Sequence, residues 1–446
     1  MNQETVVLTT KSVATIRSAS LVAWSIVNDN EPQPERPKLA VAYDITATAP
    51  MDLAARLAAR CEIVWVTDLS DEALGPMRRL LPRLGAVVDT AERSIADVAD
   101  DVSRCAVQGV AAFCDPQLRV AARLAAELGL PGNSVDVVRH LDDKFAQRQR
   151  LAAGGVAGPR FAVVPPGDSA AVDAAIAAVP TPAVIKPVRG DSSRDVVAVA
   201  DADAARQVLS GADGDMIIEE YLRDGVDVVA TGMGSYVSVE AVVQFGEPIP
   251  LAVTGKFPLA EPFRESGNFM PHPLDADLAA EVLELGSAAA RALGVENGAL
   301  HVEVKLTPDG PRVIEVNGRV GGGAIDALFA RRHGVSLTEL AVDVALGRPL
   351  DVSAEVPVTS AGPFDYEFFA QPPLSARALR SIAGSDRIVG VAGAVEAAAN
   401  RAPGDTLDWR NGSQGYVLRV SGRADDLAGV LAAPAAILAA ANIQYD

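Results

Sequence analysis

An acidic hairpin is the segment whose residue types and spacing most directly suggest chemistry. Residues 301–319, HVEVKLTPDGPRVIEVNGR, contain two runs of alternating apolar and polar side chains, separated by the turn sequence Pro-Asp-Gly. This pattern predicts two antiparallel strands. A three-residue loop at 308–310, with its glycine in the left-handed conformation, sets the register. The pairs that this register places opposite each other are Thr307 with Pro311, Lys305 with Val313, and Glu303 with Glu315.

This register brings two carboxylates face to face. Directly opposed residues have Cβ atoms about 5 Å apart, and like charges at that spacing destabilise the strand pair. A hard divalent cation with oxygen ligands would compensate Glu303 and Glu315. Strand alternation places Asn317 and Arg319 on the face of Glu315, and Ile314 on the opposite, packed face. The alternative is that both glutamates are solvated on an exposed face, because a one-residue slip would separate them.

A second group of segments suggests a phosphate site. Lys186 lies inside an apolar run, where a buried ammonium needs an anionic partner. The loop at 189–195 offers backbone N–H groups, hydroxyls and two guanidiniums, which suit a phosphate. It lacks the glycine spacings of the Walker A and Rossmann motifs. Taken alone, the loop is therefore better interpreted as an ordinary hairpin. Residues 216–222 combine an apolar strand with two acids and a tyrosine. Three glycines at 321–323 allow a ligand to approach the backbone closely.

The chain that must position these segments divides into four parts. Residues 1–37 end in a proline-rich, charged stretch that is typical of a linker. Residues 38–133 alternate short β-branched runs with stretches of helical period, which predicts a parallel sheet covered by helices. Residues 134–350 contain the chemically suggestive segments. Residues 351–446 resume strand-like runs with an Ala-rich helix, and we expect them to form a separate, smaller domain.

The composition narrows the classes of function. The chain of 446 residues has 39 Lys+Arg against 58 Asp+Glu, a net charge of −19, which would repel nucleic acid and anionic membrane surfaces. With 49% hydrophobic residues the chain is globular, yet no stretch approaches the roughly 20 apolar residues of a membrane-spanning helix. Its three cysteines fit neither a disulfide framework nor a zinc site, and its first residues lack a signal-peptide pattern. We therefore expect a cytoplasmic protein without nucleic-acid or membrane partners.

The order of these segments resembles the ATP-grasp superfamily and, within it, the carboxylate-amine ligases that join L-amino acids into dipeptides. The resemblance runs over residues 142–334 and rests on DDKFAQRQRLAAGGVAGPRF, AVIKPVRGDSSRDVV, IIEEYL, YVSVEAVV, TGKFPLAEPFRESGNFMPHPL and LHVEVKLTPDGPRVIEVNGRVGGG. It implies an α/β and α+β architecture. An ATP-grasp fold would occupy 134–350, with a lid subdomain at about 165–220, between an α/β pre-ATP-grasp domain at 38–133 and a small α+β domain at 351–446.

By position, the resemblance also implies roles for single residues. Arg319 and Lys186 would be catalytic, with Arg319 beside the transferred phosphoryl group, and Glu265 would hold a substrate ammonium. The residues assigned to ATP are Lys144, Lys186, Ser192, Ser193, Glu219, Glu220, Tyr221, Leu222 and Asp227. Those assigned to magnesium, with two ions expected and manganese as a substitute, are Glu303, Glu315 and Asn317. Those assigned to the substrates are Glu265, Asn268, Arg319, Gly322 and Gly323.

The sequence departs from the family's pattern at three places. The loop at 189–195 has Ser192 and Asp195 where relatives often carry glycines. An acid often found two residues before the Val-Ser-Val-Glu segment is replaced by Ser235, which makes Asp227 the expected ribose contact. Asn268 stands where some dipeptide ligases have a histidine, which leaves the substrate open.

The reaction that the resemblance implies forms an amide. ATP would phosphorylate a substrate carboxylate, and an amine would then displace phosphate from the acyl phosphate, while residues 189–195 close over the site. The partners would be small-molecule carboxylates and amines, the assembly a homodimer, and the setting the biosynthesis of a peptide-like natural product. Strand alternation places His301 on the face of Glu303, where we expect a structural histidine, with a role as ligand as the alternative. Two alternatives stay open: a carboxylase that activates bicarbonate, and a non-catalytic nucleotide-binding protein.

Overall fold

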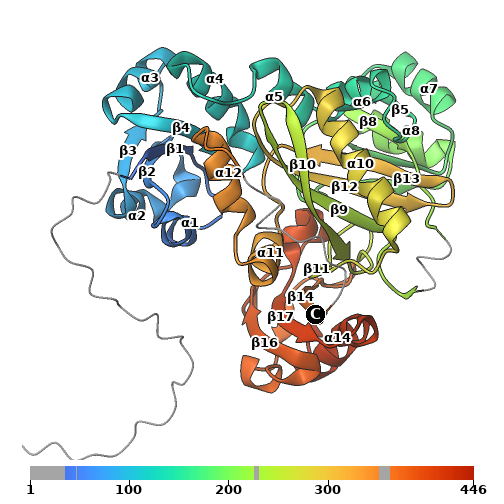
Figure 1. Cartoon of the computed structure of the whole chain (residues 1–446). Coiled ribbons are helices and arrows are strands. Elements are labelled where there is room, and N and C mark those ends of the chain that lie inside the picture. The colour runs from blue at the N-terminus through green and yellow to red at the C-terminus, as the bar shows by residue number, and fades with distance from the viewer. Residues whose placement is uncertain (1–35, 47, 226–230, 351–361) are drawn as a thin grey trace, which may run out of the picture. The chain divides into compact units, whose positions relative to one another are not determined.

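The computed structural model describes residues 36–46, 48–225, 231–350 and 362–446. These residues form four β-sheets with helices packed around them (Figure 1). Most of the expected extension at 1–37 lies outside the described residues, and so does the expected ribose contact Asp227.

A parallel sheet opens the described chain, with strand order β3-β2-β1-β4. Leu39 and Val41 of β1 belong to one apolar cluster and Ala40 to another, because helices cover both faces of the sheet. The alternation in the sequence correctly predicts this arrangement. The elements are β1 (Lys38–Ala42), α1 (Pro50–Leu57), β2 (Glu62–Thr67), η1 (Glu72–Leu74), α2 (Met77–Leu84), β3 (Ala86–Asp89), α3 (Ile95–Arg104), β4 (Val107–Ala112), η2 (Asp115–Gln117) and α4 (Leu118–Leu128).

Two helices lead from this unit into a small antiparallel sheet of order β5-β8-β6-β7, which corresponds to the expected lid subdomain. One face of this sheet carries two helices and a core of its own, in which Ile185 and Ile218 are fully buried. The elements are α5 (Val135–Asp142), α6 (Lys144–Ala153), β5 (Phe161–Val164), α7 (Ser169–Ala178), β6 (Ala183–Pro187), β7 (Val197–Val199), α8 (Ala202–Ser210) and β8 (Met216–Glu220).

An eight-stranded antiparallel sheet of order β13-β12-β9-β10-β11-β14-β17-β16 forms the largest layer, and α10 packs across its first strands (Figure 1). The strands after residue 361, which we expected in a separate, smaller domain, continue this sheet, because β14 pairs directly with β11. The elements are β9 (Tyr236–Gln244), β10 (Glu247–Lys256), β11 (Gly267–Met270), α10 (Ala276–Leu293), β12 (Gly298–Thr307), β13 (Gly310–Asn317), β14 (Phe364–Ala370), β16 (Ala394–Ala399) and β17 (Leu418–Ala424).

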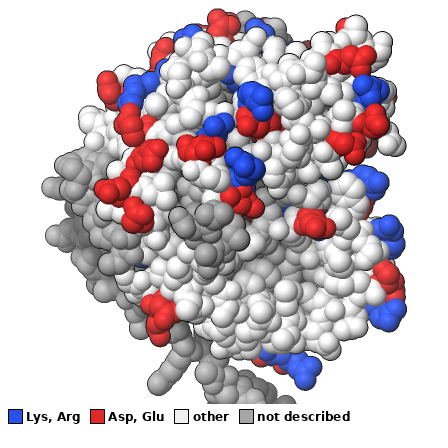
Figure 2. All heavy atoms as spheres, turned by 90° about the vertical axis from the view of Figure 1, so that its right-hand side faces the viewer, with Lys and Arg blue, Asp and Glu red and all other residues white. Residues whose placement is uncertain are grey.

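The remaining elements connect and cover these layers. None of the helices in the described ranges is both long and apolar enough to cross a membrane. Acidic and basic side chains are interspersed on the face shown in Figure 2. The elements are α11 (Ile325–His333), α12 (Leu337–Ala345), β15 (Leu379–Ser381), η3 (Ser385–Arg387), η4 (Val391–Gly393), η5 (Trp409–Gly415), α14 (Leu427–Ala441) and β18 (Gln444–Tyr445).

The turn of the acidic hairpin is one residue shorter than predicted. Only Pro308 and Asp309 form the loop, and the Thr307 hydroxyl donates to the Gly310 carbonyl at 2.6 Å, which closes the tighter turn. The predicted pairings of Thr307 with Pro311 and of Lys305 with Val313 are therefore wrong. The observed pairs near the turn are Thr307 with Gly310, Leu306 with Pro311, and Lys305 with Arg312.

A β-bulge at Ile314 then restores the register at the acidic positions. Val304 pairs with Val313, and the next pair is Glu303 with Glu315, so Ile314 is the extra residue in β13. The predicted opposition of the two glutamates is confirmed, although by a different route. The prediction that Ile314 lies on the packed face is wrong. The bulge turns its side chain into the lining of the site.

Candidate functional site

A cavity of about 880 Å³ gathers residues that follow strands of the parallel sheet, residues of the lid sheet, residues of β9, β12 and β13 of the large sheet, and residues of η5. It contains every described site residue expected from the sequence except Asn268. The expected residues that line it are Lys144, Lys186, Ser192, Ser193, Glu219, Glu220, Tyr221, Leu222, Glu265, Glu303, Glu315, Asn317, Arg319, Gly322 and Gly323.

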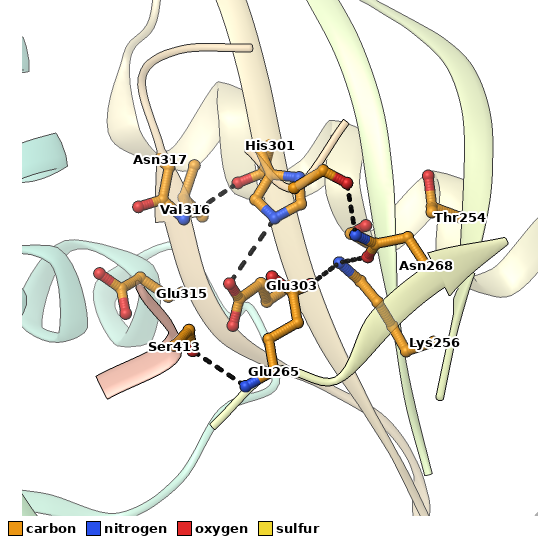
Figure 3. A network of polar contacts seen from close by, with 12 residues as sticks. Thr254, Lys256, Glu265, Asn268, His301, Glu303, Glu315, Val316, Asn317 and Ser413 are labelled. Carbon is orange, nitrogen blue, oxygen red and sulfur yellow. Dashed lines mark hydrogen bonds and ion pairs between the residues drawn. The ribbon is translucent and has the colours of Figure 1, made fainter. Parts of the chain in front are cut away.

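The two opposed carboxylates lie on one face of the β12–β13 hairpin (Figure 3), and each has a cationic neighbour in the protein. Glu315 Oε1 is 3.0 Å from Lys144 Nζ, and Glu303 Oε1 is 3.6 Å from His301 Nε2. Burial alone would raise the pKa of Glu303, but His301 and Lys256 overcome it and lower the pKa to about 2. Glu303 is therefore anionic at neutral pH.

His301 connects this pair to the carboxylate of Glu240, which lies opposite it on the neighbouring strand β9. Its Nδ1 lies 3.0 Å from Glu240 Oε2, and Glu240 also accepts hydrogen bonds from Ser238 and Thr254. Burial would lower the pKa of His301, but Glu240 outweighs it and raises the pKa to about 9. The sequence analysis missed Glu240, whose signal is an acid inside an otherwise apolar strand.

The donor set of the hairpin fits a hard divalent cation. Glu303, Glu315 and Asn317 offer carboxylate and amide oxygens toward one cavity. No group of three or more His, Cys, Asp or Glu among the described residues forms a complete metal site. Magnesium is commonly held by one or two carboxylates and completed by substrate phosphates and water, so two glutamates and an amide suit it.

A buried ion triad supports the lid side of the cavity. Glu219 accepts from Arg148 Nε at 2.7 Å and lies 2.9 Å from Lys186 Nζ, with all three side chains almost fully buried. Burial would raise the pKa of Glu219, but Arg148 and Lys186 lower it to about 2. The anionic partner that the burial of Lys186 requires is thus provided within the protein, and Lys186 also lines the cavity.

Arg148 also holds the bulge of the acidic hairpin. It donates to the Val313 carbonyl at 3.2 Å and to the Ile314 carbonyl. Arg148 lies on helix α6, and Asp143 fixes the start of this helix as its N-cap by accepting from the Ala146 N–H at 3.0 Å. The sequence analysis missed Arg148, although it lies four residues after Lys144 and so on the same helix face.

The segment after β8 retains few free backbone donors. The N–H of Glu220 bonds to the Arg160 carbonyl at 2.9 Å, and that of Tyr221 bonds to the Pro182 carbonyl at 3.3 Å. The carboxylates of Glu219 and Glu220 are also occupied by arginines. Leu222 is the next residue along the cavity wall.

The lid loop, residues 189–195, has a strained backbone. Ser192, Ser193 and Asp195 have φ values of 55°, 57° and 56°, a region that glycine adopts without steric cost. Lys144 Nζ donates to the Gly190 carbonyl at 2.6 Å. From the other side, the Ser413 N–H donates to the Ser192 carbonyl at 2.8 Å, so the lid loop is fastened to the C-terminal part of the chain.

Arg319 is held by the parallel-sheet unit. Its Nε donates to Asp115 Oδ2 at 2.8 Å, and Asp115 belongs to η2. Both residues line the cavity. The second oxygen of Asp115 is buried without a hydrogen-bond partner among the described residues. The sequence analysis missed Asp115, which follows the last strand of its sheet.

Asn268 lies behind the cavity and not in its lining. It is fully buried on β11, where its Oδ1 accepts from Lys256 Nζ at 2.6 Å and its Nδ2 donates to the Gly323 carbonyl at 2.9 Å (Figure 3). Lys256 also donates to Glu265 Oε1 at 2.9 Å. The expected direct substrate contact of Asn268 is therefore replaced by support of Glu265 and Gly323.

Ser235, which replaces the acid expected to contact the ribose, has the carboxylate of Asp224 as a neighbour. Ser235 donates to Asp224, and Lys305 Nζ lies 2.5 Å from the same carboxylate oxygen. Burial would raise the pKa of Asp224, but Lys305 and Ser235 lower it. Asp224 was not considered in the sequence analysis, and Asp227 cannot be compared with it because it is not among the described residues.

Comparison with known proteins agrees with this geometry. Residues 179–327 match the family described as ATP-grasp domain. The chain is 27% identical to the uncharacterized protein y4rH of Sinorhizobium fredii, over 71% of this chain and 64% of that protein. It is 26% identical to alanine–anticapsin ligase of Bacillus subtilis, over 52% of each chain. It is 29% identical to D-alanine–D-alanine ligase of Cupriavidus metallidurans, over 51% of this chain and 71% of that one. The chain thus spans about half to two thirds of the length of the first two relatives.

Solved structures share the fold over nearly the whole chain. L-amino acid ligase from Bacillus licheniformis superimposes with a TM-score of 0.70 at 19% identity, covering 93% of this chain and 100% of that one. Biotin carboxylase from Campylobacter jejuni gives a TM-score of 0.61 at 14% identity, covering 92% of each. Residues 179–327 thus match the ATP-grasp domain family, the chain is similar to ligases such as alanine–anticapsin ligase and D-alanine–D-alanine ligase, and it shares its fold with the solved L-amino acid ligase.

Proposed function

We propose that the chain is an ATP-dependent ligase that joins two amino acids, or amino-acid-like substrates, through an amide bond. The observation that carries the proposal is the meeting of an opposed carboxylate pair, Glu303 and Glu315, with Lys144, Lys186 and Arg319 in one cavity. Two of the relatives are named as ligases of alanine, which supports the amino-acid class. ADP and phosphate would be the other products.

In this proposal the acidic hairpin holds magnesium. Glu303, Glu315 and Asn317 would bind two ions, or manganese in their place. The bound metal would neutralise charge on the phosphates of ATP. Lys144 would turn from Glu315 to a phosphate, and its flexible stem allows that exchange of anionic partners.

The remaining side chains would position the reactants. Lys186 and the hydroxyls of Ser192 and Ser193 would contact the phosphates, while the backbone of Leu222 would face the adenine. A substrate carboxylate oxygen would take the γ-phosphoryl group, releasing ADP. The amine of the second substrate would then form the C–N bond, lose a proton and displace phosphate. Arg319, anchored by Asp115, would stabilise the oxyanion charge in both steps.

A product assay tests the proposal. The purified chain is incubated with magnesium, ATP and mixtures of the twenty proteinogenic L-amino acids, and amides are identified by mass spectrometry while ADP is measured. We expect amide and ADP in equal amounts. ADP formation that depends on bicarbonate and not on amino acids would instead indicate a carboxylase. ATP binding without turnover would indicate a nucleotide-binding protein.

A homodimeric assembly and a cytoplasmic location remain predictions. Sedimentation equilibrium of the full chain would measure the assembly, and an observed monomer mass would contradict it. A role in making a peptide-like natural product likewise rests on the resemblance alone.

A further inference from the structure

One cationic side chain in the cavity has no acidic partner in the part of the chain that the structure describes. Six other lysines and arginines line the cavity, and each forms an ion pair with a carboxylate. These six are Lys144, Arg148, Lys186, Arg194, Lys305 and Arg319. Arg401 also lines the cavity, yet no Asp or Glu of the described residues lies within ion-pair distance of its guanidinium.

None of the acidic side chains that line the cavity is available to pair with Arg401. Each of them is already paired with a cation, including Glu265 with Lys256 and Asp326 with Arg56. Arg401 is therefore the lysine or arginine of the lining for which the described residues supply no ion-pair partner. Since a guanidinium stays protonated at every physiological pH, Arg401 is available to pair with an anionic group of a ligand.

The guanidinium is held in place by backbone carbonyls. Its Nη1 donates to the Asn400 carbonyl at 2.8 Å and its Nη2 donates to the Gln414 carbonyl at 3.2 Å. These neutral acceptors fix the orientation of the side chain but leave its charge and further N–H groups available. An arginine has five N–H donors in a rigid fork that matches a carboxylate.

The same segment reaches the expected ammonium site. Ser413, next to Gln414, accepts from the Glu265 N–H at 2.9 Å through its hydroxyl (Figure 3). Gln371 donates to the carbonyls of both Glu265 and Ser413, at 2.7 and 2.9 Å. Arg401 and Glu265 are thus fixed to one hydrogen-bonded frame at the same end of the cavity, too far apart to pair with each other.

We propose that Arg401 binds the α-carboxylate of the amine substrate, so that this substrate is an amino acid and not a simple amine. The inference rests on the proposed ligase function. The carboxylate of the first substrate is consumed in the reaction, but that of the amine substrate is a permanent negative charge that the site must accommodate. Arg401 is the cation in the lining that has no other anion to hold.

Kinetics with matched pairs of acceptors test the role of Arg401. Each of the twenty proteinogenic L-amino acids is compared with its α-carboxamide, which keeps the amine and lacks the negative charge. A charge-assisted hydrogen bond is worth about 10- to 100-fold in binding. We expect Arg401→Gln to raise the KM for the amino acid by about that factor, with the KM for the carboxamide and for ATP unchanged. Arg401→Lys should recover part of the loss.

Arg410 offers a matched control. It is on the same segment, is exposed and pairs with Asp408, but it does not line the cavity. Arg410→Gln should leave every KM unchanged. If the wild type forms amides and Arg401→Gln keeps its preference for the acid over the carboxamide, Arg401 is not the anchor and the ligase function stands.

A binding measurement separates the two proposals if no amide forms. Thermal shifts of the full chain are recorded with each amino acid and with its carboxamide, in the presence of magnesium and ADP. A shift that needs the carboxylate and disappears in Arg401→Gln supports the anchor even without ligation. Absence of both amide formation and such a shift overturns the anchor together with the ligase function.

Discussion

Among single residues, Arg148 links more parts of the site than any residue expected from the sequence. It pairs with Glu219 and donates to the carbonyls of the bulge at Ile314. Removing one partner from a buried ion network leaves an uncompensated charge and costs about 3–5 kcal/mol. We expect Arg148→Met to lower the free energy of unfolding by that amount, as measured by urea denaturation. Arg150→Met, on the exposed face of the same helix, should change it by less than about 0.5 kcal/mol; equal effects would contradict this role.

The Glu219 carboxylate also predicts a dependence of stability on pH. Its pKa falls from 4.5 to about 2 because Arg148 and Lys186 outweigh the effect of burial. A carboxyl group with a lowered pKa in the folded state stabilises the protein above its unfolded pKa, and this contribution is lost as the pH falls toward the folded value. The advantage of the wild type over Glu219→Gln should therefore shrink between pH 5 and about pH 3. Urea denaturation at several pH values would measure it, and a constant difference would contradict the argument.

Arg319 is the residue whose loss should act on the reaction and not on the fold. Its guanidinium faces the cavity and is held by Asp115 at 2.8 Å. Removing one preorganised donor from a developing oxyanion typically lowers kcat about 100- to 1000-fold. We expect Arg319→Ala to show at least this loss of amide formation while its circular dichroism spectrum stays that of the wild type. Arg291→Ala, on the exposed surface of α10, serves as control, and wild-type turnover of Arg319→Ala would exclude Arg319 from the mechanism.

At the level of elements, the contact between η5 and the lid loop explains why a glycine stands at position 412. Gly412 has a φ of +63°, and a Cβ there would collide with the Ser192 carbonyl. We expect Gly412→Ala to push the lid loop away and to raise the KM for ATP several-fold, since an open lid admits water and loosens the phosphate contacts. Gly404→Ala has a comparable φ of +95° with no atom near its Cβ, so it shares the backbone strain without the collision. Equal KM values for the two variants would show that this contact does not hold the lid.

The acidic hairpin shows how far an element can be predicted from its own sequence. Strand alternation correctly placed Glu303 opposite Glu315. The turn prediction was one residue too long, and the bulge at Ile314 compensated for it. This bulge could not be inferred from the hairpin, because the donor that satisfies its carbonyls is Arg148 of α6, more than 160 residues away. Local pattern determines the strands, whereas a distant side chain determines their register.

Across the whole molecule, the sequence predicted the layers better than their connections. The parallel sheet could be predicted from strand–helix alternation, and the resemblance to the ATP-grasp superfamily could be recognised from the order of the motifs. The pairing of β11 with β14 could not, because it joins residues 267–270 to residues 365–368 and depends on no local signal. For the same reason Asn268 was expected in the lining, although a strand paired on both sides buries it. The frame that carries Glu265 and Arg401 is next to this pairing, because Glu265 precedes β11 and Gln371, which donates to the Glu265 carbonyl, follows β14.

This pairing predicts that the C-terminal part is required for the fold of the rest. Phe257 and Phe269 pack edge-to-face against each other and against Phe364, Tyr366 and Phe368 of β14, at centroid distances of 5.3–6.5 Å. Ending the chain at residue 350 would expose this aromatic cluster and leave β11 as an unpaired edge, which favours aggregation. We expect the shortened chain to be insoluble, and Phe368→Ala in the full chain to lower the free energy of unfolding by about 3–5 kcal/mol. A shortened chain that stays soluble, melts cooperatively and binds ATP would instead mean that residues 362–446 form an independent domain after all.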